Sequence, residues 1–123
     1  MKYILGLDIS TSCTGFSIFN TEGNLVELGY IRLNPKESVF SRVTEVSKSI
    51  VELDKRFNIE KTFIEENLQA FRPGLSSAKT LLTLARFNGM VSYQVYNTTG
   101  KDPIYVNVNT ARKLIGLKIN RKS

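Results

Sequence analysis

Three acidic residues stand at the ends of apolar segments, where a charged side chain needs a compensating partner. Asp8 closes the apolar run that begins at Tyr3, and Glu65 and Glu66 close a second run. Removing a carboxylate from water costs on the order of several kcal/mol, so buried acids are normally paired or bound to a metal. We therefore expect Asp8 to be buried and to have such a partner.

One of the two glutamates lies beside Asp8 if the two apolar runs are neighbouring strands. Adjacent carboxylates repel each other, and a hard divalent cation relieves that repulsion where no histidine is at hand. Because side chains alternate along a strand, only Glu65 or Glu66 can share a face with Asp8. The sequence thus predicts a divalent-metal site and leaves the choice of glutamate open.

Both acidic positions also have simpler interpretations. Asp8 precedes the polar turn Ser10-Thr11-Ser12, and its carboxylate could accept backbone N–H groups and cap that turn. Glu65 and Glu66 could be two solvated acids at the end of a strand. A hydrogen bond from the turn to Asp8 would favour the first of these alternatives.

The loop after the acidic pair, residues 67–74, carries Phe71 and Arg72. An aromatic ring beside an arginine is the combination that stacks on an unpaired base. The alternative is that Phe71 folds back onto the following helix as part of the core. We therefore treat Phe71 and Arg72 as candidate DNA contacts.

The composition narrows the chemistry further. The sequence has no histidine and one cysteine, Cys13, which excludes intrachain disulfides, zinc sites of the Cys/His kind and imidazole bases. Cys13 is expected to be a small, half-buried filler beside a turn. The formal charge of +6 suits a polyanionic partner. Any catalysis must rest on carboxylates, lysines, hydroxyls or a hard metal.

The length and hydropathy fit one globular domain. The chain has 123 residues, and its longest apolar runs are only a few residues, far short of a bilayer span. The first apolar run contains Asp8, whereas a signal peptide would keep that run uncharged. We predict a cytoplasmic protein that does not associate with membranes.

Hydrophobic periodicity predicts the elements that position these residues. Alternating and continuous apolar runs predict strands at residues 3–9, 15–19, 25–33, 61–66 and 104–108. An amphipathic helix is predicted between Ser38 and Asn58, with the apolar stripe Phe40, Val43, Val46, Ile50, Leu53 and Phe57. A second helix is predicted from about Leu75 to Tyr96, followed by a loop at 97–103, and a short last helix at 109–114. The order indicates an α/β fold with a mixed five-stranded sheet flanked by helices, whose first three strands form an antiparallel meander.

The second helix is apolar on two sides. Its stripes are Ala78, Leu81, Leu82, Ala85 and Gly89 on one side, and Leu84, Phe87, Val91 and Val95 on the other. Such a helix is either deeply buried or shared with a partner chain. In a domain of this size, a shared helix is at least as plausible as a deeply buried one.

The order and spacing of these motifs resemble RuvC-type Holliday junction resolvases, and among them small phage-encoded members. Such proteins begin with a strand that ends in a catalytic Asp, then a small-residue turn and a Gly-aromatic pair, as in Ile4-Leu5-Gly6-Leu7-Asp8 and Thr14-Gly15-Phe16. Phe63-Ile64-Glu65-Glu66 resembles the family's second motif. Residues 77–89 resemble the helix that follows, and residues 106–117 the segment that leads to the last active-site helix. The resemblance covers nearly the whole chain.

The resemblance implies a ribonuclease H-like nuclease domain over residues 1–123 that resolves branched DNA, such as four-way junctions, by phosphodiester hydrolysis. Asp8 and Glu65 would be two of four carboxylates that hold a pair of Mg²⁺ or Mn²⁺ ions. It also implies a homodimer, with the helix from Leu75 to Tyr96 at the interface. The candidate DNA contacts are Ser10, Ser12, Leu68, Phe71, Arg72, Lys113, Lys118 and Lys122.

The sequence departs from the family in two respects. The remaining two acids, which the family carries on a C-terminal helix, have no counterpart, so we expect a chain that lacks this helix and is either a fragment or a protein that binds without cutting. The family's junction-stacking aromatic stands closer to the glutamate than Phe71 does, and Leu68 lies nearer to that place.

Two rival interpretations remain open. The first is a non-catalytic module of the same ancestry that binds branched DNA. The second is a nucleotide-binding domain like those of sugar kinases and actin-like ATPases, in which residues 7–12 would face phosphate. The small size and the Ile-Glu-Glu strand end argue against the kinase interpretation.

Overall fold

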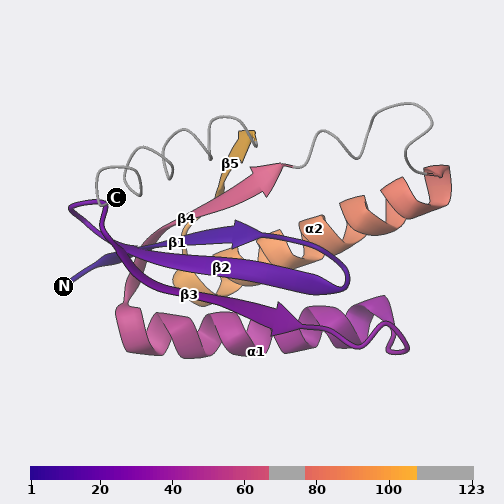
Figure 1. The fold of residues 1–123 in the computed structure, drawn as a ribbon, viewed down its shortest axis with the longest axis horizontal. Coiled ribbons are helices and arrows are strands. Elements are labelled where there is room, and N and C mark those ends of the chain that lie inside the picture. The colour runs from indigo at the N-terminus through magenta and orange to yellow at the C-terminus, as the bar shows by residue number, and fades with distance from the viewer. Residues whose placement is uncertain (67–76, 108–123) are drawn as a thin grey trace.

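A computed structural model of the chain describes residues 1–66 and 77–107. Within these ranges five strands form one mixed sheet (Figure 1). The strands are β1 (Tyr3–Asp8), β2 (Cys13–Asn20), β3 (Leu25–Arg32), β4 (Ile59–Glu66) and β5 (Ile104–Asn107). The helices are α1 (Val39–Phe57) and α2 (Ala78–Thr99).

The sheet has the strand order β3-β2-β1-β4-β5. The first three strands pair antiparallel, as short connections require, while β4 runs parallel to β1 and β5 parallel to β4. The predicted meander is confirmed, and the first and fourth strands are neighbours, which is the condition for the predicted acid pair. β1 is therefore the central strand, and its carboxyl end lies beside that of β4.

Both helices cover the same face of the sheet (Figure 1). A single core lies between that face and the helices. Its buried members include Leu5, Leu7, Ile18 and Ile64 from the strands, Val46 and Ile50 from α1, and Phe87, Val91 and Val95 from α2. The predicted burial of Phe40 is wrong: this residue of the first turn of α1 is 72% exposed and borders a surface groove between α1 and α2. Among the described residues the opposite face of the sheet is not covered by a helix.

Side-chain and backbone caps set the helix boundaries. Ser38 caps α1 by accepting the Ser41 N–H (3.0 Å), and Asn58 ends the helix in the left-handed region with φ 49°. Ser77 caps α2 by accepting the Thr80 N–H (3.1 Å). The loop predicted at residues 97–103 begins later than expected: α2 runs on to Thr99 and ends where Gly100 takes a φ of 75°, which leaves residues 100–103 as the connection to β5.

An ion pair ties the end of α1 to β3. Arg56 donates two hydrogen bonds to the Glu27 carboxylate, at 2.6 and 3.0 Å, and its guanidinium lies 4.7 Å from the centre of the Phe57 ring. The hydrogen bond from Arg56 holds the pKa of the Glu27 carboxyl below its usual value, and the same contact raises the pKa of Arg56. The pair fixes α1 against the edge of the meander.

The two apolar stripes of α2 have different environments. Phe87, Val91 and Val95 are buried in the core, whereas Ala78, Leu82, Ala85 and Gly89 are exposed. Tyr93 and Tyr96 extend the exposed stripe by two more turns. Among the described residues α2 is therefore buried on one side and exposed on the other, and the interpretation of α2 as a helix shared with a partner chain stays a prediction.

Two further predictions can be placed. The short last helix predicted at residues 109–114 lies outside the described residues. No helix within 1–66 and 77–107 has the length and apolar character needed to cross a membrane.

The packing of Phe16 over Gly29 provides a test of the meander. A Cβ atom at Gly29 would lie 2.5 Å from Phe16 Cζ, so Gly29→Ala must displace the ring, at a cost of about 1–3 kcal/mol in the free energy of unfolding. Gly15→Ala is the matched control, since a Cβ atom there meets its nearest neighbours at 3.7 Å. Urea unfolding measures both variants. Equal stability of the two would contradict the packing, and Phe16→Leu should recover part of the loss in the Gly29 variant.

Candidate metal centre

Asp8 and Glu65 share the face of the sheet that the helices leave open. The parallel register pairs Leu7 with Ile64, both of which point into the core. The next residue of each strand, Asp8 and Glu65, therefore points to the other face. Both residues border one cleft of about 250 Å³ on that face.

The register also distinguishes the two glutamates. Glu66 follows Glu65 and so points to the helix side, where it borders a groove with Ile9, Asn88 and Tyr105. Glu65 borders both hollows, whereas Asp8 borders the cleft on the open face and does not line the groove on the helix side. Glu65 is therefore the glutamate that accompanies Asp8.

The expected burial of Asp8 is wrong. Its side chain is exposed, while Glu65 is of intermediate exposure. The reason is positional: Asp8 is the last residue of β1 and faces away from both helices, so among the described residues only strand neighbours lie near it. Water or a bound cation can therefore reach its carboxylate without any change in the core.

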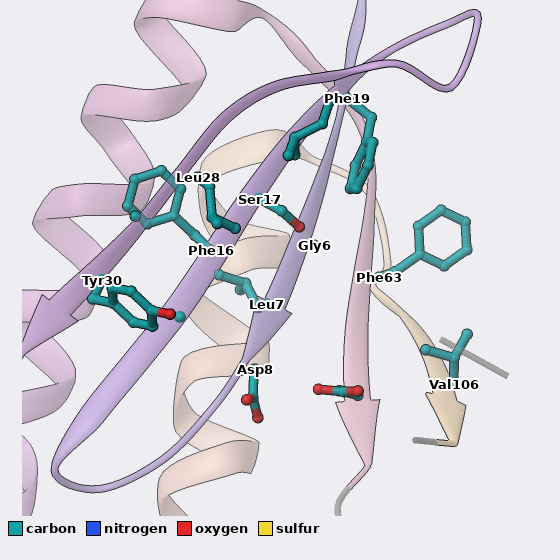
Figure 2. A pocket seen from close by; sticks show the side chains of 14 residues that line it. Gly6, Leu7, Asp8, Phe16, Ser17, Phe19, Leu28, Tyr30, Phe63 and Val106 are labelled. Atoms are coloured by element: carbon teal, nitrogen blue, oxygen red, sulfur yellow. The ribbon is translucent and has the colours of Figure 1, made fainter. Parts of the chain in front are cut away.

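One row of residues crosses the sheet on the open face. Gly15 pairs with both Tyr30 and Asp8, and Glu65 pairs with Val106. In Figure 2 the Asp8 side chain projects from the end of β1, with Tyr30 on one side and Val106 on the other. Because Gly15 carries no side chain, the approach to Asp8 along this row stays open.

The remaining lining of the cleft is mainly apolar. Apart from the row described above, its residues are Gly6, Leu7, Phe16, Ser17, Phe19, Leu25, Leu28, Gly29 and Phe63. Ser17, Tyr30 and the two acids supply the polar side-chain groups of the cleft. A mostly apolar cleft with a few convergent polar groups at one end is typical of a binding site.

The turn after Asp8 does not depend on the aspartate. Among the described residues the Asp8 carboxylate accepts no hydrogen bond, and Thr14 closes the turn by bonding to the backbone of Ser10. Ser10 and Ser12 place their hydroxyl oxygens 3.4 Å apart in the same turn. The interpretation of Asp8 as a turn cap is therefore not supported, and its carboxylate remains available.

The oxygen donors at this site fit a hard divalent cation in kind but not in number. Asp8 and Glu65 are the type of ligand that Mg²⁺ and Mn²⁺ prefer. Within residues 1–66 and 77–107 no group of three or more acids or cysteines is close enough to hold a metal. The described residues thus provide two ligands, and water or phosphate oxygens would have to complete the coordination.

The other predicted contacts are placed unevenly. Ser10 and Ser12 lie in the turn that follows Asp8, and neither lines the cleft. The remaining candidates lie outside the described residues and stay predictions: Leu68, Phe71, Arg72, Lys113, Lys118 and Lys122. Sequence inspection missed Thr14 and Arg42, which hold the turn. Thr14 immediately before Gly15, on the core side of an alternating strand, was the available signal.

Known proteins with related sequences are Holliday junction resolvases. No protein-family model matches the chain. The crossover junction endodeoxyribonuclease RuvC of Aliarcobacter butzleri is 28% identical over 116 residues, which cover 92% of this chain and 71% of that protein. The RuvC of Campylobacter lari is 25% identical over the same length and 70% of its own chain.

Solved structures agree with the sequences. RuvC of Thermus thermophilus, in complex with a Holliday junction substrate, superposes with a TM-score of 0.72 over 92% of this chain and 69% of that one, at 14% identity. This chain is similar to RuvC-type Holliday junction resolvases. The predicted ribonuclease H-like fold is confirmed as well.

The fold is shared with kinases, as the rival interpretation expected. A polyphosphate/ATP-glucomannokinase from Arthrobacter superposes with a TM-score of 0.58 over 96% of this chain and 50% of that one, at 14% identity. At this identity the likeness concerns the fold alone. The proteins with related sequences, in contrast, are resolvases, and the sequence match covers 92% of this chain.

Thermal unfolding with added Mn²⁺ tests the metal site. Ligand binding to the folded state stabilises it by RT ln(1 + [L]/Kd), which is about 1.4 kcal/mol at ten times the Kd. We expect Asp8→Asn and Glu65→Gln each to abolish most of this gain. Glu66→Gln, which makes the same chemical change one residue away, should keep it because Glu66 faces the helices. A gain that depends on Glu66 and not on Glu65 would contradict the assignment.

Proposed function

We propose that this protein is a divalent-metal-dependent endonuclease that resolves Holliday junctions or other branched DNA. The observation that carries the proposal is the placement of Asp8 and Glu65 at the ends of adjacent parallel strands, on the same open face. The relatives' activity as crossover junction endodeoxyribonucleases supports it. The chain thus combines the acid pair of a nuclease with the fold of the resolvases.

The chain's own residues have two tasks in this chemistry. Asp8 and Glu65 would hold Mg²⁺ or Mn²⁺, which when bound supplies an activated water and stabilises the leaving 3′ oxygen. Each acid follows a residue that is buried in the core, Leu7 before Asp8 and Ile64 before Glu65. The separation of the two carboxylates is therefore set by the pairing of β1 with β4. Ser10 and Ser12 can donate hydrogen bonds to the phosphate that lies across the turn.

The polyanionic partner is supported by charge. Lysine and arginine number 17 and the acids 11, so the protein attracts DNA as a whole although its cleft is locally acidic. The Thermus thermophilus relative was solved in complex with a Holliday junction. We propose a four-way junction as the substrate, bound in a strongly salt-dependent manner.

A cleavage assay with a labelled four-way junction tests the activity. In Mg²⁺ or Mn²⁺ we expect cuts in wild-type protein, a loss of at least about a hundredfold in Asp8→Asn and Glu65→Gln, and junction binding close to wild type in both. Binding is measured separately by gel shift in Ca²⁺. Strong Mg²⁺-dependent ATP binding with no preference for junctions would contradict the proposal and favour the nucleotide-binding interpretation.

A second candidate function is a non-catalytic module that binds branched DNA. It is favoured by one observation, namely that the described residues bring together only two carboxylates. The same experiment separates the two candidates. Junction binding without cutting, unchanged by Asp8→Asn and by removal of divalent cations, would establish the binding module and end the nuclease proposal.

We propose further that the protein is a homodimer through the exposed stripe of α2. This stripe consists of Ala78, Leu82, Ala85, Gly89, Tyr93 and Tyr96. The small residues allow two helices to approach closely, and Leu82 and Tyr93, exposed by 55% and 60%, provide apolar area for burial. A two-fold dimer also matches the symmetry of a four-way junction.

A charge placed in the stripe should disrupt the dimer. Ala85→Glu sets two like charges against each other across the two-fold axis, and we expect the dimer dissociation constant to rise by about a hundredfold or more. Thr80→Glu is the matched control, since it adds the same charge on the opposite side of α2. Sedimentation equilibrium measures both. A monomeric wild type, or an Ala85 variant that dimerises as the wild type does, would contradict this interface.

A further inference from the structure

The turn that follows Asp8 is closed by a side chain rather than by the sheet. The last backbone pair between β1 and β2 joins Asp8 to Gly15, and the two strands separate beyond it. At that point Thr14 Oγ1 accepts the Ser10 N–H at 3.4 Å and donates to the Ser10 carbonyl at 3.1 Å. The threonine hydroxyl thus satisfies both backbone groups of Ser10, as an opposing strand residue would.

Other parts of the fold hold the same turn from outside. Arg42, on α1, donates from Nη1 to the Thr11 carbonyl at 2.9 Å, and the Leu33 N–H donates to the Ser12 carbonyl at 3.0 Å. Ile9, between Asp8 and Ser10, is buried in the core. Each residue from Asp8 to Ser12 is therefore held in place, either by a backbone hydrogen bond or, in Ile9, by burial of the side chain.

The Thr14 side chain is enclosed to an extent that its neighbours in the turn are not. It is 0% exposed, whereas Ser12 is exposed and Ser10 is half-buried. Burying a hydroxyl group costs free energy unless the group is hydrogen-bonded, and the Thr14 hydroxyl has two such bonds, both to Ser10. The Asp8 carboxylate, two residues from this lock, accepts no hydrogen bond among the described residues, so its direction is set by the backbone.

We propose that Thr14 is a positioning residue for the metal site: by locking Ser10 it fixes the direction of the Asp8 carboxylate and of the turn hydroxyls, with Arg42 as a second brace. This inference rests on the proposed metal-dependent function. Thr14 itself lies beneath the turn and touches neither metal nor DNA. Thr14 keeps the distance between the Asp8 and Glu65 carboxylates constant, so the turn does not have to become ordered when a cation binds.

A matched pair of threonines makes the inference testable. Thr62, on β4, is also buried, at 3% exposure, but its hydroxyl has no partner among the described residues. Thr14→Val and Thr62→Val are therefore the same substitution in the same sheet, and only the first removes hydrogen bonds to the turn. Thr14→Ser keeps the hydroxyl and serves as the conservative rescue.

The Mn²⁺ concentration at half-maximal thermal stabilisation is the readout, with amide exchange of Ser10 as a second measurement that needs no metal. For Thr14→Val we expect a midpoint about tenfold above that of the wild type and faster exchange at Ser10. Thr14→Ser and Thr62→Val should stay within about twofold of the wild type. Arg42→Met, which removes only the brace to Thr11, should raise the midpoint several-fold and covers the case in which Thr14→Val does not fold.

The outcomes separate this inference from the proposed function. A wild type that responds to Mn²⁺, with Thr14→Val and Arg42→Met at the same midpoint, would overturn the positioning role and leave the metal site standing. A loss in Thr62→Val as large as that in Thr14→Val would show a general effect of stability and also overturn it. A wild type that takes up no Mn²⁺ ends the proposed metal site, and the positioning role with it.

Discussion

The parallel pairing of β1 with β4 is the constraint on which the rest of the molecule depends. It sets Leu7 beside Ile64 on the core face, and one residue further it sets Asp8 beside Glu65 on the open face. A shift of one residue in this register would turn Glu66 toward Asp8 and Glu65 toward α2. Such a slip would bury a charge and expose an apolar side chain, so the energetics of the core hold the acid pair in place.

The described helices cover only one face of the sheet, and this explains where exposed side chains lie. With α1 and α2 both on the core face, Leu28 and Tyr30 of β3 remain exposed on the other face, around the cleft. The exposed stripe of α2 lies outside the core. Two of the exposed apolar areas among the described residues enter our proposals: the cleft as the substrate site and the stripe of α2 as the contact with a second copy.

Sequence patterns predicted the elements that are governed by burial. The five strands, the stripe Val43, Val46, Ile50 and Leu53, and the caps at Ser38 and Asn58 all follow from local periodicity and turn chemistry. The patterns failed where tertiary context decides. Phe40 fits the period but stands at a surface groove between α1 and α2. The exposure of Asp8 follows from which face of the sheet the helices occupy. The role of Thr14 required knowing how the turn folds back.

Charge resolves the apparent conflict between a basic protein and an acidic site. The excess of +6 draws a polyanion toward the surface at long range, but within a few ångströms the carboxylates of Asp8 and Glu65 repel a phosphate. A divalent cation reverses that local sign while leaving the long-range attraction intact. If the protein binds a cation and DNA here as we propose, the acid pair would oppose close approach of DNA until the cation is bound, and DNA binding and metal binding would strengthen each other.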